Sequence, residues 1–407
     1  MYSVRVKTLV YCSPYLFGIR RWYRAYRLDA ESYRTLSHAA NGMELLPRVQ
    51  EIEWETEDDD LYPYITLLLS RITYRLRLYF PHDPNLSVEE RSQSQRMRFS
   101  LIRAIPSSSP HITELSLRGF RAESWPDVRD ALDALCFWPS LQCLTLYYFP
   151  EESTVILRKI PNLQKLNLFH CDRAPWLQFP LPSGLRGFPE LAQLDIQYNE
   201  LQFLIPMTSI MRNTPLRALC AESSSNSTPS VNNWKQLFDL MRDGITHPSL
   251  EVVKLRFVDD TDRMDRFEVH ERPMTLDQMS GLLVFKNLIH LSLEATHGFD
   301  LDDEHMKTLA FALPHLEELH LRSYYPLADG PRMTFEGLDS IAQYCPALQS
   351  LTVAFDGRSI IKRSNNRGIC NVNTKSFEVL DSPVDDPAAV SVYLSAIFPN
   401  LVNFSWR

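Results

Sequence analysis

Two acid-rich stretches contain the residue types that bind a divalent cation. Asp259–Asp265 reads Asp-Asp-Thr-Asp-Arg-Met-Asp, and Asp300–His305 reads Asp-Leu-Asp-Asp-Glu-His. A calcium loop of the EF-hand type also needs a glycine at its sixth position and a glutamate at its twelfth, and both stretches fail this test. The first reads better as an exposed loop, and the second as a helix start, where acidic side chains are favoured. We therefore expect no metal site.

Other catalytic patterns are absent from the sequence. It has no Walker phosphate loop, no Gly-x-Gly-x-x-Gly, no His-Glu-x-x-His and no Gly-x-Ser-x-Gly. With only 12 glycines in 407 residues, a phosphate cradle built from backbone amides is not expected. The sequence predicts a protein that is not an enzyme and that needs no cofactor.

The strongest charge cluster runs from Glu51 to Asp60. Like charges repel and stay hydrated, so an exposed strand face leading into a solvated loop explains it. An acidic edge for a basic partner is the alternative.

One phrase, Pro-x-Leu-x-x-Leu-x-Leu, recurs along the chain, and such self-similarity has to be interpreted before any other feature. Pro314–Arg322 carries it with Leu316, Leu319 and Leu321. From Pro110 onward the copies follow one another at intervals of roughly 22 to 38 residues, which overlaps the leucine-rich-repeat range and leaves room for insertions. The first apolar residues of these copies are Ile112, Leu141, Leu163, Leu191, Leu216, Leu250, Leu288, Leu316, Leu348, Phe377 and Leu401.

The phrase predicts a short strand, because its last two apolar residues are two apart and point to the same face. Segments with helical spacing lie between the copies, at 127–137, 234–245, 302–313, 336–344 and 388–398. We also expect helices at 33–46, 61–70 and 96–105, and loops at 81–95, 223–230 and 259–273. The predicted fold is an α/β leucine-rich-repeat solenoid, a curved horseshoe with parallel strands on the concave face and helices on the convex face. Residues 46–407 would supply about twelve to thirteen repeats, and residues 1–45 an N-terminal cap or the remnant of another region.

The polar residues of each strand should face the concave side, as in the rows Glu51, Glu53, Glu55; Arg75, Arg77, Tyr79; and Glu114, Ser116, Arg118. This surface mixes charged, hydroxyl and aromatic side chains, as protein-binding surfaces do. Arginine and tyrosine most often dominate interface energetics. The candidate partner-binding residues are Tyr147, Lys165, Phe169, Arg256, His320 and Arg322.

Net charge, the length of apolar runs and the cysteine pattern indicate which class of partner and which cellular compartment to expect. The net charge of −8 argues against nucleic acid as the partner, and no apolar run is long enough to span a membrane. The seven cysteines are scattered and form no Cys-x-x-Cys pair, which indicates reduced thiols in the cytoplasm or nucleus. Met1–Arg21 does not have the pattern of a secretion signal, because Pro14 interrupts its apolar part.

Three features together resemble the leucine-rich-repeat part of F-box proteins from mushroom-forming fungi. They are Leu45–Trp54, Asp60–Ser70 and the recurrent phrase at irregular intervals. The resemblance implies the substrate-recognition part of an SCF-type ubiquitin ligase, with a substrate protein on the concave face and a Skp-type adaptor and cullin as further partners. The sequence before residue 45 lacks the Leu-Pro-x-Glu-Ile phrase of an F-box, so residues 1–45 would be an N-terminal cap or the remnant of a lost or divergent F-box region. A stand-alone repeat scaffold with no ubiquitin role therefore remains the alternative.

Overall fold

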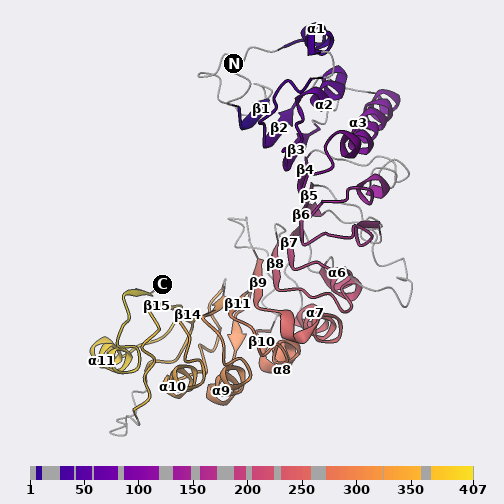
Figure 1. Ribbon diagram of the computed structural model, residues 1–407. Helices are drawn as coiled ribbons and strands as arrows, with labels where there is room; N and C mark the ends of the chain where they lie inside the picture. The colour runs from indigo at the N-terminus through magenta and orange to yellow at the C-terminus, as the bar shows by residue number, and fades with distance from the viewer. Residues whose placement is uncertain are drawn as a thin grey trace. The chain divides into compact units, whose positions relative to one another are not determined.

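The computed structural model contains two compact units of repeated strands and helices (Figure 1). Unit 1 comprises residues 1–174 and 188–191, and unit 2 comprises residues 175–187 and 192–407. The structure describes residues 6–11, 28–40, 43–56, 59–80, 87–118, 132–147, 156–171, 188–198, 204–223, 231–257, 272–323, 325–358 and 368–406. The predicted loops at 223–230 and 259–273 lie almost wholly outside these residues, as does the whole acidic stretch Asp259–Asp265.

Unit 1 is a parallel sheet whose strands follow the order of the chain. Each strand pairs with the next in register, so equivalent residues of successive repeats lie side by side. The strands are β1 (Thr8–Tyr11), β2 (Glu51–Glu55), β3 (Arg75–Tyr79), β4 (Glu114–Arg118), β5 (Cys143–Tyr147) and β6 (Lys165–Cys171). The intervening helices are α1 (Ala30–Ala40), η2 (Asp59–Tyr64), α2 (Ile65–Leu68) and α3 (Val88–Ser108), and η2 is a 3₁₀ helix.

Unit 2 repeats the same arrangement, again with parallel strands in chain order. Its main strands are β7 (Gln193–Tyr198), β8 (Ala218–Ser223), β9 (Val252–Phe257), β11 (His290–Ala295), β13 (Glu318–Ser323), β14 (Ser350–Val353), β15 (Ser376–Val379) and β16 (Asn403–Trp406), and β10 (Met274–Thr275) pairs with β12 (Phe299–Asp300). The helices are α6 (Leu204–Ile210), α7 (Val231–Gly244), η5 (His247–Ser249), α8 (Leu276–Met279), η6 (Ser280–Leu282), α9 (Asp303–Ala312), α10 (Phe335–Tyr344) and α11 (Pro387–Ile397).

The repeated phrase forms the core of each unit. In Pro314–Arg322, the side chains of Leu316 and Leu319 are fully buried and that of Leu321 nearly so. Leu316 fills the turn before the strand, and the other two point from β13 toward the helices. Because one repeat cannot bury this apolar face alone, neighbouring repeats stack over it. The predicted α/β leucine-rich-repeat solenoid is confirmed.

Helix ends follow simple capping chemistry. The Asp302 carboxylate accepts a hydrogen bond from the His305 amide at 3.0 Å, which satisfies one of the unpaired donors at the start of α9. The acids of Asp300–His305 are thus a helix start, as predicted. In α9 the side chains of Met306, Leu309 and Ala310 are buried, in agreement with the predicted helical spacing.

Several predicted boundaries or types are wrong. The helix predicted at 33–46 is α1, which begins at Ala30 and ends at Ala40. The helix predicted at 96–105 is α3, which begins at Val88 and includes Pro106, so part of the predicted loop at 81–95 is helical. The segment 61–70 forms η2 and the short α2 instead of one α-helix, because Pro63 lies inside it. Phe377 is not the first apolar residue of its repeat, since it pairs with Leu351 and Phe404 in the middle of β15.

Residues before 45 contribute a strand that the phrase did not reveal. β1 pairs in parallel with β2, and the ring of Tyr11 stacks on that of Trp54 with centroids 4.4 Å apart. Tyr33 of α1 contacts the same indole at 5.9 Å. These contacts help to bury Trp54, which is fully inaccessible to solvent.

Candidate functional site

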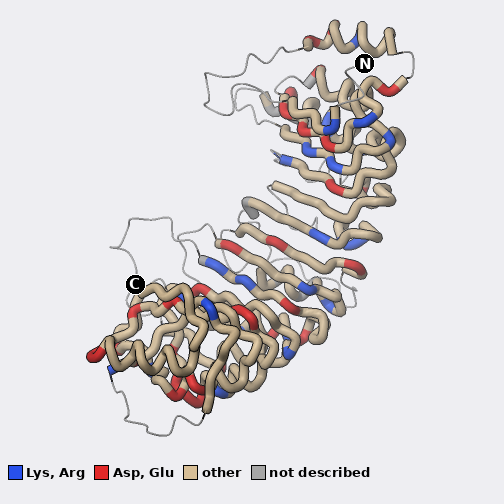
Figure 2. Tube along the Cα trace, turned by 60° about the vertical axis from the view of Figure 1, so that its left-hand side comes forward, with Lys and Arg blue, Asp and Glu red and all other residues tan. Residues whose placement is uncertain are grey.

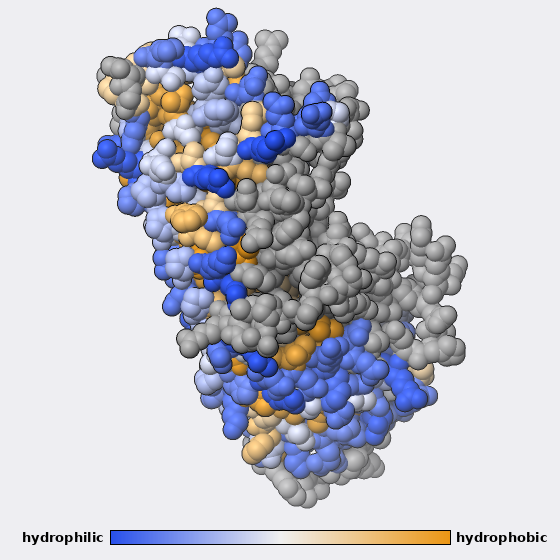
Figure 3. All heavy atoms as spheres, turned by 90° about the vertical axis from the view of Figure 1, so that its right-hand side faces the viewer, coloured by the Kyte–Doolittle hydropathy of each residue, from blue (hydrophilic) through white to orange (hydrophobic). Residues whose placement is uncertain are grey.

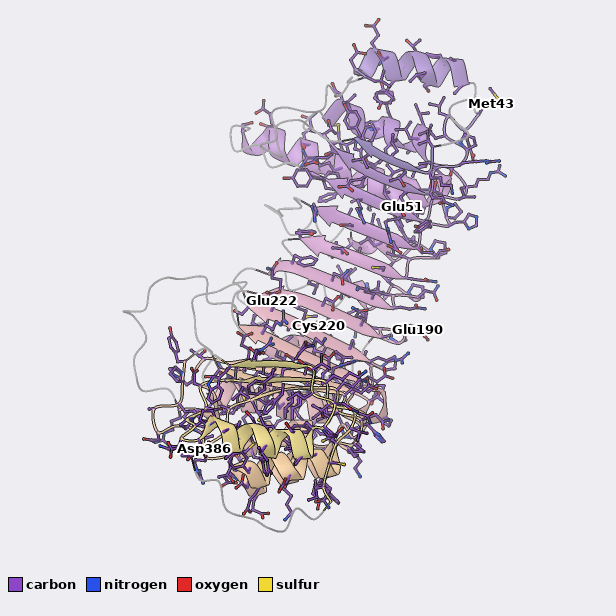
Figure 4. All side chains as sticks on the ribbon, turned by 90° about the vertical axis from the view of Figure 1, so that its left-hand side faces the viewer. Met43, Glu51, Glu190, Cys220, Glu222 and Asp386 are labelled. Atoms are coloured by element: carbon purple, nitrogen blue, oxygen red, sulfur yellow. The ribbon has the colours of Figure 1, made fainter. Side chains whose placement is uncertain are left out.

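Each unit has a strand face, which we define as the side of its sheet that carries the alternate, polar residues of the strands. In β5 the side chains of Cys143, Thr145 and Tyr147 are partly exposed, whereas Leu144 and Leu146 between them are buried. The same alternation holds in β3 and β4. Figure 4 shows Glu51 of unit 1 and, in unit 2, Cys220 and Glu222, which are alternate residues of β8 with the buried Ala221 between them. The predicted direction of these side chains is therefore correct.

A ladder of ion pairs crosses the first strands of unit 1. The Arg75 guanidinium lies 3.1 Å from Glu51 on β2 and 2.6 Å from Glu114 on β4. One row further along the strands, Arg77 lies 3.0 Å from Glu53. Figure 2 shows acidic and basic residues interspersed over unit 1. Two members of the acidic stretch, Glu51 and Glu53, are thus compensated by arginines of the next repeat rather than being only solvated.

The ion pairs and hydrogen bonds of this ladder shift the pKa values of its charged groups. The hydrogen bond from the Tyr74 hydroxyl, at 2.6 Å, is the main cause that lowers the pKa of Glu51, and Arg75 adds to it. The hydrogen bond to Glu114 is the main cause that raises the pKa of Arg75. A charged hydrogen bond to each neighbour fixes the guanidinium in place.

The strand face of unit 1 also carries a stack of one arginine and two aromatic rings, formed by Arg118, Tyr147 and Phe169. The Arg118 guanidinium carbon lies 4.8 Å from the centre of the Tyr147 ring. On its other side, the Tyr147 ring stacks on Phe169 with centroids 4.8 Å apart and planes 21° apart. Tyr147 and Phe169 pair in register on β5 and β6, so the ladder itself brings the rings together.

The ladder and the stack border one depression of about 870 Å³. Its floor includes Thr145 and Asn167, and the Asn167 side-chain nitrogen donates a hydrogen bond to the Thr145 hydroxyl at 2.8 Å. Lys165 also lines it. Three of the six predicted residues, Tyr147, Lys165 and Phe169, are therefore brought together here.

A polar network occupies the strand face of unit 2. The carboxylate of Glu318 lies 3.0 Å from His290, 3.7 Å from Lys254 and 3.9 Å from His320. The other ring nitrogen of His320, Nδ1, lies 2.8 Å from the hydroxyl of Thr352, which is buried despite its polar position.

Burial, followed by the nearby Arg322, holds the pKa of His320 below its usual range. Arg322 is itself paired with Glu378 at 2.8 Å. His320 and Arg322 thus lie in one network. Its carboxylates, Glu318 and Glu378, act in the opposite direction and raise the pKa of His320.

Arg256, the last predicted residue, lies at the end of β9 and is exposed. Within the described part of the chain, no carboxylate forms an ion pair with it. Two residues that the prediction did not include also belong to these surfaces. Arg118 had been placed on the strand face but not chosen, and Glu378 was overlooked because Phe377 was assigned to the wrong position of its repeat.

No described group of three or more histidine, cysteine, aspartate and glutamate side chains is placed to hold a metal ion. None of the described helices is long and apolar enough to cross a membrane. Figure 3 shows the helical side of unit 1, where hydrophilic side chains are interspersed with small hydrophobic patches.

Sequence comparison identifies no relative: no family model matches the chain, and no curated protein does. Structural comparison finds an internalin (inlF) from Listeria monocytogenes, with 12% identity, a TM-score of 0.45, and coverage of 90% of this chain and 83% of the other. It also finds the yeast Rad7 and Elc1 complex, with 15% identity, a TM-score of 0.44, and coverage of 92% and 82%. A third structure is the leucine-rich-repeat protein LegL7 of Legionella pneumophila, with 12% identity, a TM-score of 0.35, and coverage of 78% and 93%.

Proposed function

We propose that this protein binds a partner protein through its strand faces and carries out no reaction itself. The observation that carries the proposal is the depression of about 870 Å³ in unit 1, which combines a fixed ion-pair ladder with stacked aromatic rings. Arginine and tyrosine anchors in a preformed site lose little conformational entropy on binding. Leucine-rich-repeat folds present such surfaces to other proteins, and no cofactor is needed for this role.

The finer proposal is that the bound protein is a ubiquitylation substrate. It rests on the resemblance of Leu45–Trp54, Asp60–Ser70 and the repeat phrase to fungal F-box proteins with leucine-rich repeats. In this role the protein would act in the cytoplasm or nucleus with a Skp-type adaptor and cullin. Residues 46–407 would form the recognition solenoid, and residues 1–45 would cap it through Tyr11 and Tyr33 against Trp54.

One observation favours the alternative of a stand-alone scaffold. The first 45 residues contain no Leu-Pro-x-Glu-Ile phrase, and those that the structure describes supply a strand of the sheet and one helix. The described residues of this segment thus extend and cover the repeat sheet.

A pull-down with purified Skp-type adaptor separates the two roles. We expect the 407-residue chain to retain the adaptor if it is a ligase receptor. A variant carrying Tyr33→Ala tests whether α1 takes part, and Ser100→Ala on the exposed side of α3 serves as the matched control. Failure to retain the adaptor would reject the ligase role for this chain and leave the scaffold role.

The double variant Lys165→Glu and Arg256→Glu tests partner binding itself. Because both side chains lie on strand faces, reversing their charge should weaken capture of interacting proteins without unfolding the chain. Affinity capture followed by mass spectrometry, with circular dichroism of each variant, measures both effects. Unchanged capture by a folded double variant would contradict the proposed binding surfaces.

A further inference from the structure

The Arg118 guanidinium lies over the Tyr147 ring, and its N–H groups can still donate hydrogen bonds to an anion. A guanidinium that lies face-on against a ring keeps its N–H donors at its edge, where they can form two parallel hydrogen bonds to a carboxylate. Arg118 is exposed, and among the described residues no carboxylate pairs with it. Its position is set by the ring beneath it, so little further ordering is needed when an anion binds.

Of the three glutamates that line the depression, Glu55 is buried, and the other two are engaged by other arginines. Glu114, on the same strand as Arg118, lies 2.6 Å from Arg75, and Glu53 lies 3.0 Å from Arg77. The side of the depression formed by β4–β6 therefore carries Arg118 and Lys165, with its acidic residue Glu114 already compensated. A partner that brings an acidic group to this side would complement the charge.

The second half of the stack defines a second requirement. The ring of Phe169 lies against Tyr147, and both line the depression with partial exposure. An aromatic side chain can extend such a stack, since offset ring pairs at 4.5–7 Å contribute beyond simple burial. Polar groups of the floor, Ser116 and Thr145, can meet the backbone of an extended segment.

We infer that the depression of unit 1 binds an extended peptide segment of a partner protein that carries an aspartate or glutamate next to an aromatic residue. The acidic side chain pairs with the edge of Arg118, and the aromatic ring extends the stack at Phe169, since both faces of the Tyr147 ring are already covered. This inference rests on the proposed protein-binding function and specifies the partner's chemistry.

Selection from a random dodecapeptide library displayed on phage tests the inference. The immobilised 407-residue chain is the bait, and the Arg118→Glu variant is panned in parallel. We expect the selected sequences to be enriched in an acidic residue adjacent to tyrosine, phenylalanine or tryptophan, and this enrichment to disappear on Arg118→Glu. Enrichment of no sequence, or of sequences without this pair, would overturn the inference.

Titration of the most enriched peptide, labelled with fluorescein, gives the quantitative test by fluorescence anisotropy. Arg118→Glu should raise Kd by roughly tenfold or more, because an attractive charge becomes repulsive. Tyr147→Ala should also raise it, with folding checked by circular dichroism. Arg48→Glu is the matched control, since Arg48 is also exposed and has no described carboxylate partner but does not line the depression.

The variant Arg256→Glu separates failure of the inference from failure of the proposed function. Peptides that lose binding on Arg256→Glu and keep it on Arg118→Glu would show that the chain binds proteins elsewhere, and would overturn the assignment to this depression. Partner capture by the Lys165→Glu and Arg256→Glu variant remains an independent test of the proposed function.

Discussion

At the scale of single residues, the sequence determines the direction of a side chain more readily than its partner. Alternation in the repeat phrase placed Arg75, Arg77 and Arg118 on the same face. Only the first two find carboxylates among the described residues, and those belong to repeats that lie 24 or 39 positions away in the chain. The sequence therefore predicts the surface, but the pairing depends on the register between strands, which spacing alone does not define.

His320 makes the stability of the chain depend on pH. Its pKa is lowered in the folded state, mainly by burial, so the unfolded chain binds a proton at a higher pH than the folded chain does. In the window from the ordinary value of 6.5 down to the lowered pKa, the unfolded state is the more protonated one. The free energy of unfolding therefore falls as pH falls through this window, by at most about 1.4 kcal/mol per pH unit for one proton.

The variant His320→Gln should weaken this dependence. Urea denaturation at pH 7.5 and 5.5 would show a smaller loss of stability between the two values than in the unsubstituted chain. His315→Gln, which replaces an exposed histidine, is the control. An equal loss in the His320→Gln variant would mean that this ring does not contribute.

At the scale of elements, α3 differs from its prediction at both ends. Pro106 was expected to end a helix at Ile105, yet α3 continues to Ser108. Its start is fixed by Ser87 and Glu90, whose side chains each bond to the other's backbone amide. This capping box is visible in the sequence as Ser-x-x-Glu, but the polar composition of the segment favoured a loop.

Ser87→Ala should lower the free energy of unfolding by about 1 kcal/mol, because the first turn of α3 loses its side-chain acceptor. Ser100→Ala, in the middle of the same helix, should be neutral or slightly stabilising, since alanine has the higher helix propensity. Urea denaturation of both variants measures the contrast. Equal effects would show that the cap contributes nothing specific.

The misassigned repeat at β15 has an equally local cause. The position before the strand that leucine fills elsewhere is taken by Thr374, which is fully buried and donates a hydrogen bond to the carbonyl of Leu348 at 3.0 Å. Thr73 does the same before β3, bonding to the carbonyl of Val49 at 3.0 Å. A pattern that counts only apolar residues cannot recognise a threonine that satisfies the backbone of the preceding repeat.

At the scale of the molecule, each unit is held together by contacts between successive repeats. The strand β13 pairs with β11 and with β14. Helix α9 lies between β11 and β13 in the chain. Stability in such a stack is close to a sum of repeat and neighbour contributions. The fold class could be read from the phrase because every repeat restates it, whereas insertions and exact boundaries vary from repeat to repeat.

Leu319→Ala should therefore destabilise unit 2 locally. Removing a fully buried leucine from β13 costs about 2–5 kcal/mol. Hydrogen exchange followed by mass spectrometry should show the largest loss of protection in β11, β13 and β14, and little change in β3 and β4. A uniform loss across both units would show that the chain unfolds as a single cooperative body.

The in-register strand faces have a consequence for how recognition can change over time. Each repeat contributes its own short row to the surface, while the residues that hold the repeat in place point the other way. The strand-face residues of one repeat can thus be substituted while its buried leucines are kept. Within one strand, the buried positions stabilise the fold and the alternate, partly exposed positions are those proposed to contact the partner. Substitutions at the exposed positions can therefore change which partner binds while the buried leucines are kept.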